Sequence, residues 1–356
     1  MERALEIAES LLARPTAPFH EDEPVRFALD LAKATPGLSA DVDAAGNVVV
    51  RTEGPGVPLV LVAHLDHPGF AVDLVIGATA ELSFRGGLAE VAALVGSRVQ
   101  FFRQGMSGPV GEGELVGTIG EADRLTAASA IILSGETRVG DFAMWAFPPF
   151  ELEEGRITAR ACDDLVGAAA ILSCLETAAT GTSRPVWGLL TRAEEVGLLG
   201  AFEAIRLGTV PVDAVVLSLE CSKALPEAPQ GQGVIVRVGD RMSIFDPAVT
   251  AALTTVAAAA NIPYTRRLMD GGVCEASAFC AAGYRASGLC IALGNYHNAD
   301  DVGRGVGPEH VLADDYLAEV RLLDRLATTP LDLDPYGPWL AERTEKAQDA
   351  LGAGGA

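Results

Sequence analysis

The stretch LVLVAHLD at residues 59–66 decides the fold. Its first five residues are apolar without alternation, and Gly56 and Pro58 lie just before them. Such a short apolar run after chain-breaking residues is typical of a strand that is buried on both faces of a parallel sheet. Because the run leads into His64 and Asp66, we expect two polar side chains at the carboxyl end of a buried strand.

The chain on both sides of this strand alternates between predicted strands and helices. A helical segment at 1–35 and a strand hairpin at 39–52 come before it. Beyond residue 160, predicted strands cover 185–191, 212–219 and 288–293. Five helices are predicted between and after these strands: one after Asp163, one at about 197–207, one that begins near Pro247 with Asp246 as its N-cap, one at about 273–282 and one after Pro308. This alternation predicts an α/β fold with a mostly parallel, doubly wound sheet that carries helices on both faces.

Residues 72–153 differ from the rest of the chain. Glycine and proline recur at short spacing there, as in SGPVGEGELVGTIG, and short β-like runs such as 98–102 lie between them. Only a weak helical pattern, near 121–132, interrupts this texture. We therefore predict a small β-rich domain at 72–153, inserted between the two parts of an α/β domain at 1–71 and 154–330, with a C-terminal tail at 331–356.

Composition excludes several kinds of partner. The 356 residues include 48 acidic and 26 basic side chains, which gives a formal net charge of −22. A basic face for nucleic acid or anionic lipid is therefore not expected, and no stretch of ~20 residues is apolar enough to span a bilayer. The N-terminus is charged rather than signal-like, and the six cysteines form no Cys-x-x-Cys pair, so we expect reduced thiols and a cytoplasmic protein.

Polar residues follow four of the apolar runs and occupy one helix start. These residues are His64 and Asp66, Asp163 and Asp164, Glu194 and Glu195, Glu220, and His297. In open α/β sheets ligands bind at the carboxyl ends of the strands. Each position alone has an ordinary structural explanation, such as an Asp pair that caps a helix, but their shared placement predicts one site.

Six of these side chains are carboxylates, and few basic residues adjoin them in the sequence. A buried carboxylate without a partner costs several kcal/mol, so six together would protonate or stay unfolded unless cations bind. Two divalent ions would supply the positive charge, and the two histidines would add neutral nitrogen ligands. This mixture of nitrogen and oxygen donors suits zinc, manganese or cobalt better than calcium or magnesium. The sequence therefore predicts a two-metal site.

Five motifs resemble those of the co-catalytic di-zinc exopeptidases. They are AHLDHPG at 63–69, CDDLVGAAA at 162–170, AEEVGLLGA at 193–201, GGVCEA at 271–276 and LGNYHN at 293–298. The insertion between the first two motifs, together with GLLGA after the glutamates, resembles the tetrahedral aminopeptidase family of deblocking and glutamyl aminopeptidases. The resemblance covers most of residues 1–325 and is weak within the insertion.

The resemblance implies a role for each candidate residue. Asp163 would bridge two metal ions. His64 and Glu220 would complete the binding of one ion, and Glu195 and His297 would complete the binding of the other. Asp66 would hold His64 in one tautomer, and Glu194 would be the general base. The implied activity is that of an aminopeptidase that removes N-terminal residues from short peptides with metal-activated water. It implies two divalent ions per subunit, with zinc expected and cobalt or manganese as alternatives, and a homo-oligomer, either a dimer or a dodecamer.

The chain also departs from the family pattern. Glu220 stands where the family usually has Asp, His67 stands where an acidic residue is common, and GGVCEA replaces Gly-Gly-Thr-Asp. These departures leave open the role of His67, the role of 271–276 and the side-chain preference at the substrate N-terminus. The uncharged apolar run at 143–150 leaves two alternatives, burial under the inserted domain or an oligomer interface.

Two other functions stay open. A di-zinc deacylase or carboxypeptidase that acts on N-acyl amino acids would need a cation for the substrate carboxylate. The candidates for that cation are Arg241, Arg266, Arg267 and Arg285. A catalytically inactive, peptidase-like scaffold is the other alternative, and the presence of all five implied ligands and of Glu194 disfavours it.

Overall fold

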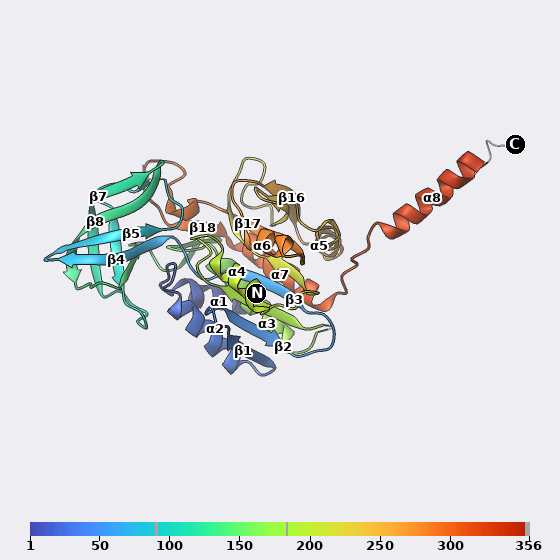
Figure 1. Ribbon diagram of the computed structural model, residues 1–356, viewed down its shortest axis with the longest axis horizontal. Coiled ribbons are helices and arrows are strands. Elements are labelled where there is room, and N and C mark those ends of the chain that lie inside the picture. Colours follow the sequence, from blue (N-terminus) through green and yellow to red (C-terminus); the bar gives the residue numbers. More distant parts are fainter. Residues whose placement is uncertain (90–91, 183, 353–356) are drawn as a thin grey trace.

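A computed structural model describes residues 1–89, 92–182 and 184–352. Its larger part is a nine-stranded sheet with helices packed on it, and a separate β barrel lies at one end (Figure 1). The strands of the sheet are β1 (Leu38–Val42), β2 (Val48–Thr52), β3 (Leu59–His64), β12 (Val186–Thr191), β13 (Val215–Ser218), β14 (Cys221–Lys223), β15 (Val234–Asp240), β16 (Tyr264–Met269) and β17 (Arg285–Leu293). The strand order is β1-β2-β12-β3-β13-β17-β15-β16, with β14 beside β17.

Most neighbouring strands of this sheet run parallel. Strand β3 lies between β12 and β13 and pairs with both of them in parallel. The antiparallel pairs are β1 with β2, β2 with β12, and β15 with β17. The predicted fold class, a mostly parallel α/β sheet with a small separate β-rich part, is confirmed.

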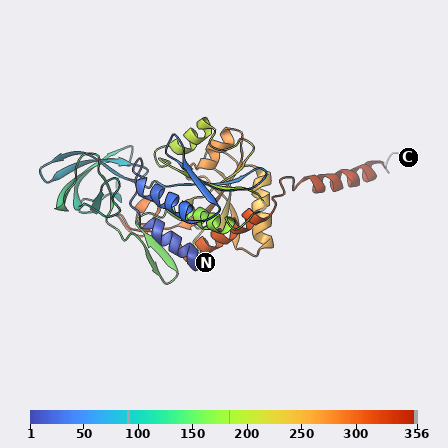
Figure 2. The ribbon, with the colours of Figure 1, turned by 90° about the horizontal axis from the view of Figure 1, so that it is seen from below.

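Helices cover both faces of the sheet (Figure 2). They are α1 (Glu2–Leu12), α2 (Asp22–Ala34), α3 (Leu165–Ala178), α4 (Leu199–Leu207), α5 (Pro247–Ala259), α6 (Glu275–Ala281) and α7 (Ala313–Thr328). Alternate residues of β3 supply both cores: Leu59 and Leu61 pack with α1 and α3, whereas Val60 and Val62 pack with α4 and α6. The apolar run of β3 has no alternation because both of its faces are buried.

The barrel closes in the order β4-β5-β8-β7-β6-β9. Its strands are β4 (Gly69–Ile76), β5 (Thr79–Arg85), β6 (Arg98–Phe102), β7 (Gly111–Glu121), β8 (Arg124–Gly135) and β9 (Phe142–Trp145). The weak helical pattern near 121–132 does not produce a helix, because most of this segment belongs to β8, which pairs with both β5 and β7. Its small alanines suit a helix equally well in isolation, and pairing on both sides decides the structure.

The apolar run at 143–150 begins inside the molecule. Ala143 and Trp145 belong to the barrel core, and Met144 belongs to the core of the large sheet. The first of its two alternatives, burial, therefore holds for the β9 part of the run. The domain boundaries at 72 and 153 stay a prediction.

Two further parts complete the described chain. A small antiparallel sheet joins β10 (Glu151–Glu153), β11 (Arg156–Ala159) and β18 (Glu309–Leu312). In the predicted tail, α8 (Gly337–Gly352) extends away from the molecule with no buried residue (Figure 1), while residues 353–356 lie outside the described residues. None of the helices in the described ranges is both long enough and apolar enough to cross a bilayer.

Candidate metal centre

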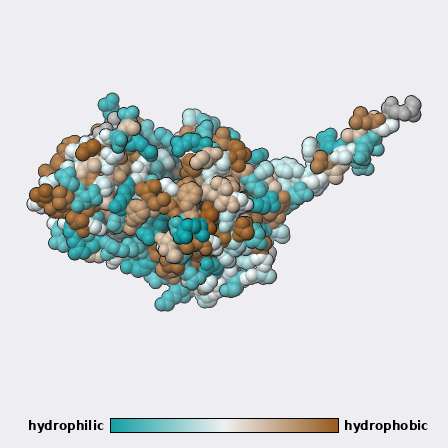
Figure 3. Space-filling view, viewed as in Figure 1, coloured by the Kyte–Doolittle hydropathy of each residue, from teal (hydrophilic) through white to brown (hydrophobic). Residues whose placement is uncertain are grey.

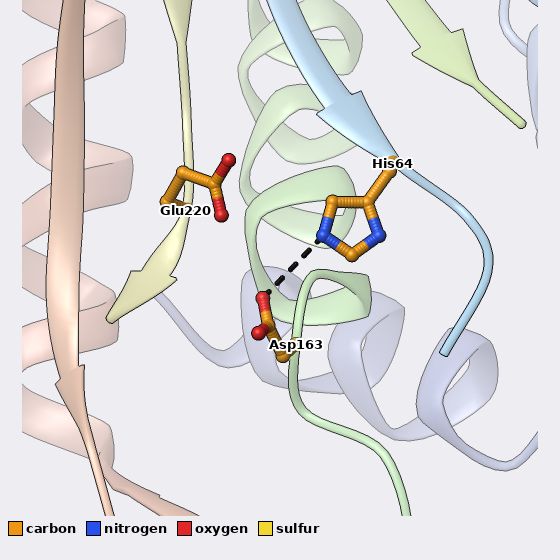
Figure 4. A group of neighbouring side chains, drawn as sticks. All are labelled: His64, Asp163 and Glu220. Carbon is orange, nitrogen blue, oxygen red and sulfur yellow. Dashed lines mark ion pairs between the residues drawn. The ribbon is translucent and has the colours of Figure 1, made fainter. Parts of the chain in front are cut away.

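The predicted site residues come together at the carboxyl ends of the central strands. His64 is the last residue of β3, Glu220 lies between β13 and β14, and Asp163 lies just before α3 (Figure 4). Glu194 and Glu195 occupy the turn between β12 and α4, and His297 lies in a short 3-10 helix after β17, η2 (Tyr296–Asn298). Segments that are distant in the sequence thus converge at one edge of the sheet, as open α/β folds favour.

Asp163 stands between the two histidines. Its Oδ1 is 3.5 Å from His64 Nε2, and its Oδ2 is 3.5 Å from His297 Nε2. Glu195 Oε1 lies 3.2 Å from the same His297 nitrogen. Among the described residues, four groups have possible ligand atoms within 4.8 Å of one another. Two of them overlap at Asp163, namely His64 with Asp163 and Glu220, and Asp163 with Glu195 and His297; the others are His64 with Glu194 and Glu195, and Asp163 with Asp164 and Cys221.

The donor atoms of these groups fit divalent cations. Asp163 Oδ1, Glu195 Oε1 and Glu220 Oε1 are buried oxygens without a hydrogen-bond partner. Leaving buried acceptors unpartnered is costly, whereas such oxygens beside neutral imidazole nitrogens are ordinary ligands for zinc-type ions. Asp163, shared by the two groups that overlap, has the placement that a bridging ligand requires.

The pKa values of these carboxyl groups indicate that the cluster lacks positive charge. Burial raises the pKa of Glu220 to about 8, and the charge of Asp163 adds to this effect. Burial likewise raises the pKa of Glu194 well above its ordinary value. Burial opposes ionisation of Asp163 as well, but the nearby imidazoles of His297 and His64 outweigh it and hold the pKa of Asp163 below its ordinary value. The cluster therefore favours the uptake of positive charge, whether as protons or as metal ions.

Asp66 orients the site through both its backbone and its side chain. His64 Nδ1 lies 3.0 Å from the Asp66 carbonyl oxygen, while the carboxylate Oδ1 is further away, at 3.6 Å. The carboxylate instead accepts hydrogen bonds from the backbone N–H groups of Glu194, at 2.9 Å, and Glu195, at 3.1 Å. The Asp66 side chain thus fixes the glutamate pair directly and contacts His64 only at longer range.

Sequence reasoning missed a second carboxylate behind the glutamate pair. Glu21 is fully buried and accepts hydrogen bonds from Arg192 Nε, at 2.7 Å, and from the backbone N–H of Ala193, at 3.1 Å. It lies just before α2, far from the turn in sequence. No local pattern distinguishes Glu21 from the other acidic residues around it, so only the three-dimensional structure reveals this contact.

A cavity of about 180 Å³ adjoins Glu220. Arg237, Met269, Val273 and Tyr296 are among the residues that line it. Arg237 is only 3% exposed, its Nε has no hydrogen-bond partner, and no ion pair of this residue is found in the described part of the chain. The charges of Glu220 and Asp240 act on this guanidinium, so Arg237 places a buried positive charge at the cavity, close to the candidate metal ligands.

The arginines predicted as substrate-binding cations lie elsewhere. Arg285 pairs with Asp246 at 3.0 Å, and Arg267 donates to the Glu227 carbonyl at 2.9 Å. None of Arg241, Arg266, Arg267 and Arg285 lines the cavity beside Glu220. Arg237, inside β15, lines this cavity together with Lys223.

Comparisons with known proteins agree with the fold and indicate the class of enzyme. A family model for M42 glutamyl aminopeptidase matches residues 132–303. A putative aminopeptidase of Acetivibrio thermocellus is 26% identical over 249 residues, covering 65% of this chain and 72% of its own. Among solved structures, a TET aminopeptidase from Thaumarchaeota archaeon SCGC AB-539-E09 has a TM-score of 0.79 at 21% identity, covering 93% of this chain and 98% of its own. The Pyrococcus horikoshii TET1 peptidase has a TM-score of 0.77 at 18% identity, covering 92% and 100%.

The fold, the convergent His and carboxylate residues and these matches define a peptide hydrolase of the aminopeptidase class. Within that class, the resemblance to the tetrahedral aminopeptidase family is confirmed by the M42 match and by the shared fold.

Proposed function

We propose that this aminopeptidase is a di-metal enzyme that removes N-terminal residues from short peptides. The observation that carries the proposal is the placement of the Asp163 carboxylate, with one oxygen toward His64 and the other toward His297. His64, Asp163 and Glu220 would hold one ion, and Asp163, Glu195 and His297 the other. Zinc is expected, with cobalt or manganese as alternatives. Bound there, two divalent cations would polarise the substrate carbonyl and lower the pKa of water.

Glu194 is the residue proposed to move protons. Its Oε2 lies 4.0 Å from His64 Nε2, at the border of the ligand cluster, and its backbone is held by Asp66. Burial raises the pKa of its carboxyl group, which favours proton uptake. In this role Glu194 takes a proton from the attacking water and returns it to the leaving amine. Asp66 contributes by keeping the glutamate pair in place.

Arg237 supports a preference for acidic substrates. An N-terminal glutamate or aspartate side chain in the cavity beside Glu220 could accept hydrogen bonds from the buried guanidinium, whose Nε has no partner among the described residues. The glutamyl activity in the name of the matched family agrees with this preference. The same guanidinium also suits the carboxylate of an N-acyl amino acid, so a deacylase or carboxypeptidase remains the second candidate.

A substrate panel separates the candidates. Stripped protein is reloaded with zinc, cobalt or manganese and assayed on Glu-, Asp-, Leu- and Lys-p-nitroanilides and on N-acetyl amino acids. The proposal expects cleavage of substrates with a free amino group, fastest for Glu or Asp. Cleavage of the N-acetyl compounds alone would establish the deacylase instead. No cleavage with any metal would favour the inactive scaffold.

A homo-oligomer, a dimer or a dodecamer, is proposed from the barrel surface. Exposed apolar side chains of β4, β7 and β8 are Leu74, Ile76, Val116, Ile119, Ile131 and Leu133. Figure 3 shows hydrophobic residues on the barrel, at the left of the view. Apolar surface of this kind is typical of interfaces, and the Pyrococcus horikoshii TET1 peptidase assembles into a tetrahedron or an octahedral shell. Sedimentation velocity at micromolar concentration tests the proposal against a monomer of 36.9 kDa.

A further inference from the structure

Glu309 is a buried carboxylate beneath the candidate metal centre that the proposed mechanism does not use. It belongs to β18 and is 0% exposed. Its Oε2 accepts hydrogen bonds from the backbone N–H groups of Cys162, at 2.7 Å, and Asp163, at 3.1 Å. Its Oε1 accepts a hydrogen bond from the backbone N–H of His297, at 2.8 Å. One side chain therefore holds the two segments that carry the shared carboxylate and one of the histidines.

His67 joins the third ligand-bearing segment to this arrangement. Its Nδ1 lies 2.9 Å from the Asp163 carbonyl oxygen, and its Nε2 lies 3.0 Å from Asn298 Oδ1. The Asn298 amide nitrogen donates to the carbonyl oxygens of Arg160 and Gly307, which directs its Oδ1 toward His67. The segment after β3 is thus tied to those that carry Asp163 and His297.

The contacts of Glu309 are those of a group that positions ligands. Its oxygens face three backbone donors, and it belongs to none of the candidate metal-binding groups found among the described residues. Because its two oxygens hold different segments, a change at this side chain alters the separation of Asp163 from His297. Groups that orient metal ligands in this way typically change metal affinity or activity by roughly 10–100-fold when they are replaced.

We propose that Glu309, supported by His67, is a positioning residue that sets the spacing between Asp163 and His297 and thereby the affinity of the site for its cations. This proposal rests on the proposed di-metal function. It also gives His67, which departs from the family pattern, a role in fixing the site.

The substitution Glu309→Gln tests the proposal. Glutamine keeps the size of the side chain but has one acceptor oxygen, so its NH2 group must face either His297 N–H or the N–H pair of Cys162 and Asp163. Zinc affinity of the stripped protein is measured by chelator competition, beside its melting temperature. We expect zinc binding to weaken by roughly 10–100-fold. The matched control is Asp315→Asn on α7, a buried carboxylate that likewise accepts hydrogen bonds from backbone N–H groups, those of Gly231 and Gly233, which carry none of the candidate ligands; the zinc affinity of this variant should equal that of the wild type.

The outcomes are distinct. Unchanged zinc affinity in Glu309→Gln overturns the positioning role, even if the stripped variant melts earlier, and leaves the di-metal function standing. Failure of the wild type to bind zinc, cobalt or manganese overturns both. If Glu309→Gln does not fold, His67→Gln replaces it, since the glutamine amide mimics Nε2 and loses the contact with Asp163. That variant should also weaken zinc binding, and an unchanged affinity contradicts the proposal.

Discussion

Glu194 and Glu195 are adjacent residues with different surroundings. Glu195 Oε1 lies 3.2 Å from His297 Nε2 and belongs to the group around Asp163, whereas Glu194 lies at the border of the cluster, 4.0 Å from His64. We therefore expect Glu194→Gln to keep both metal ions and to lower kcat by roughly 10²–10⁴-fold, the usual effect of losing a general base. Elemental analysis beside steady-state kinetics checks this. Loss of metal in Glu194→Gln, with metal retained in Glu195→Gln, would show that the two roles are reversed.

A second prediction at the residue scale concerns Arg237. Substitution by methionine keeps a long, unbranched side chain but removes the charged guanidinium at the cavity beside Glu220. A hydrogen bond to a charged group is worth about 1.5–3 kcal/mol, so kcat/KM for Glu-p-nitroanilide should fall by roughly 10–100-fold. Leu-p-nitroanilide serves as the control and should change little. An equal loss for both substrates would mean that Arg237 supports the fold rather than selects the substrate.

At the scale of elements, α7 carries a buried charge whose effect depends on pH. Burial, and then the charge of Asp315, raises the pKa of Glu319 from 4.5 to about 8. Asp164, Cys221 and Cys290 are the titratable groups of other elements that interact with it. Between these two pH values the unfolded chain is ionised while the folded chain stays protonated, so the stability contributed by Glu319 falls as the pH rises.

Glu319→Gln removes this dependence. We expect the variant to gain stability relative to the wild type as the pH rises from about 5 to 8, by more than about 1 kcal/mol in total. Urea denaturation of the metal-loaded proteins at several pH values measures the difference. A constant difference across this range would show that Glu319 is ionised in the folded protein throughout.

Sequence patterns predicted the elements whose signals are local. The run of β3 is apolar because both faces are buried, and Asp246 caps α5 by accepting hydrogen bonds from the N–H groups of Ala248 and Val249, as predicted. In contrast, the segment of β8 has a weak helical pattern, because its alanines fit either structure and only the pairing with two neighbouring strands decides between them. Strand β18 was missed before α7, since four residues after Pro308 carry too short a pattern.

At the scale of the whole molecule, some residues of the candidate site could be predicted from local sequence patterns and others could not. The possible ligands could be predicted because they follow apolar runs that end at one edge of the sheet. The supporting residues could not be predicted, since Glu21, Arg237 and Glu309 act across long stretches of chain: Glu309 binds the Asp163 N–H from 146 positions away. Such contacts depend on strand order, which no local pattern encodes.

The most direct test of the di-metal proposal is the metal content and thermal stability of the purified wild-type chain. In this proposal the buried carboxylates without partners bind cations, and binding to the folded state adds stability. We expect two divalent ions per subunit. Removal of these ions should lower the melting temperature and abolish activity, and zinc or cobalt should restore the melting temperature and the activity. An unchanged melting temperature after verified removal of all metal would contradict the di-metal centre.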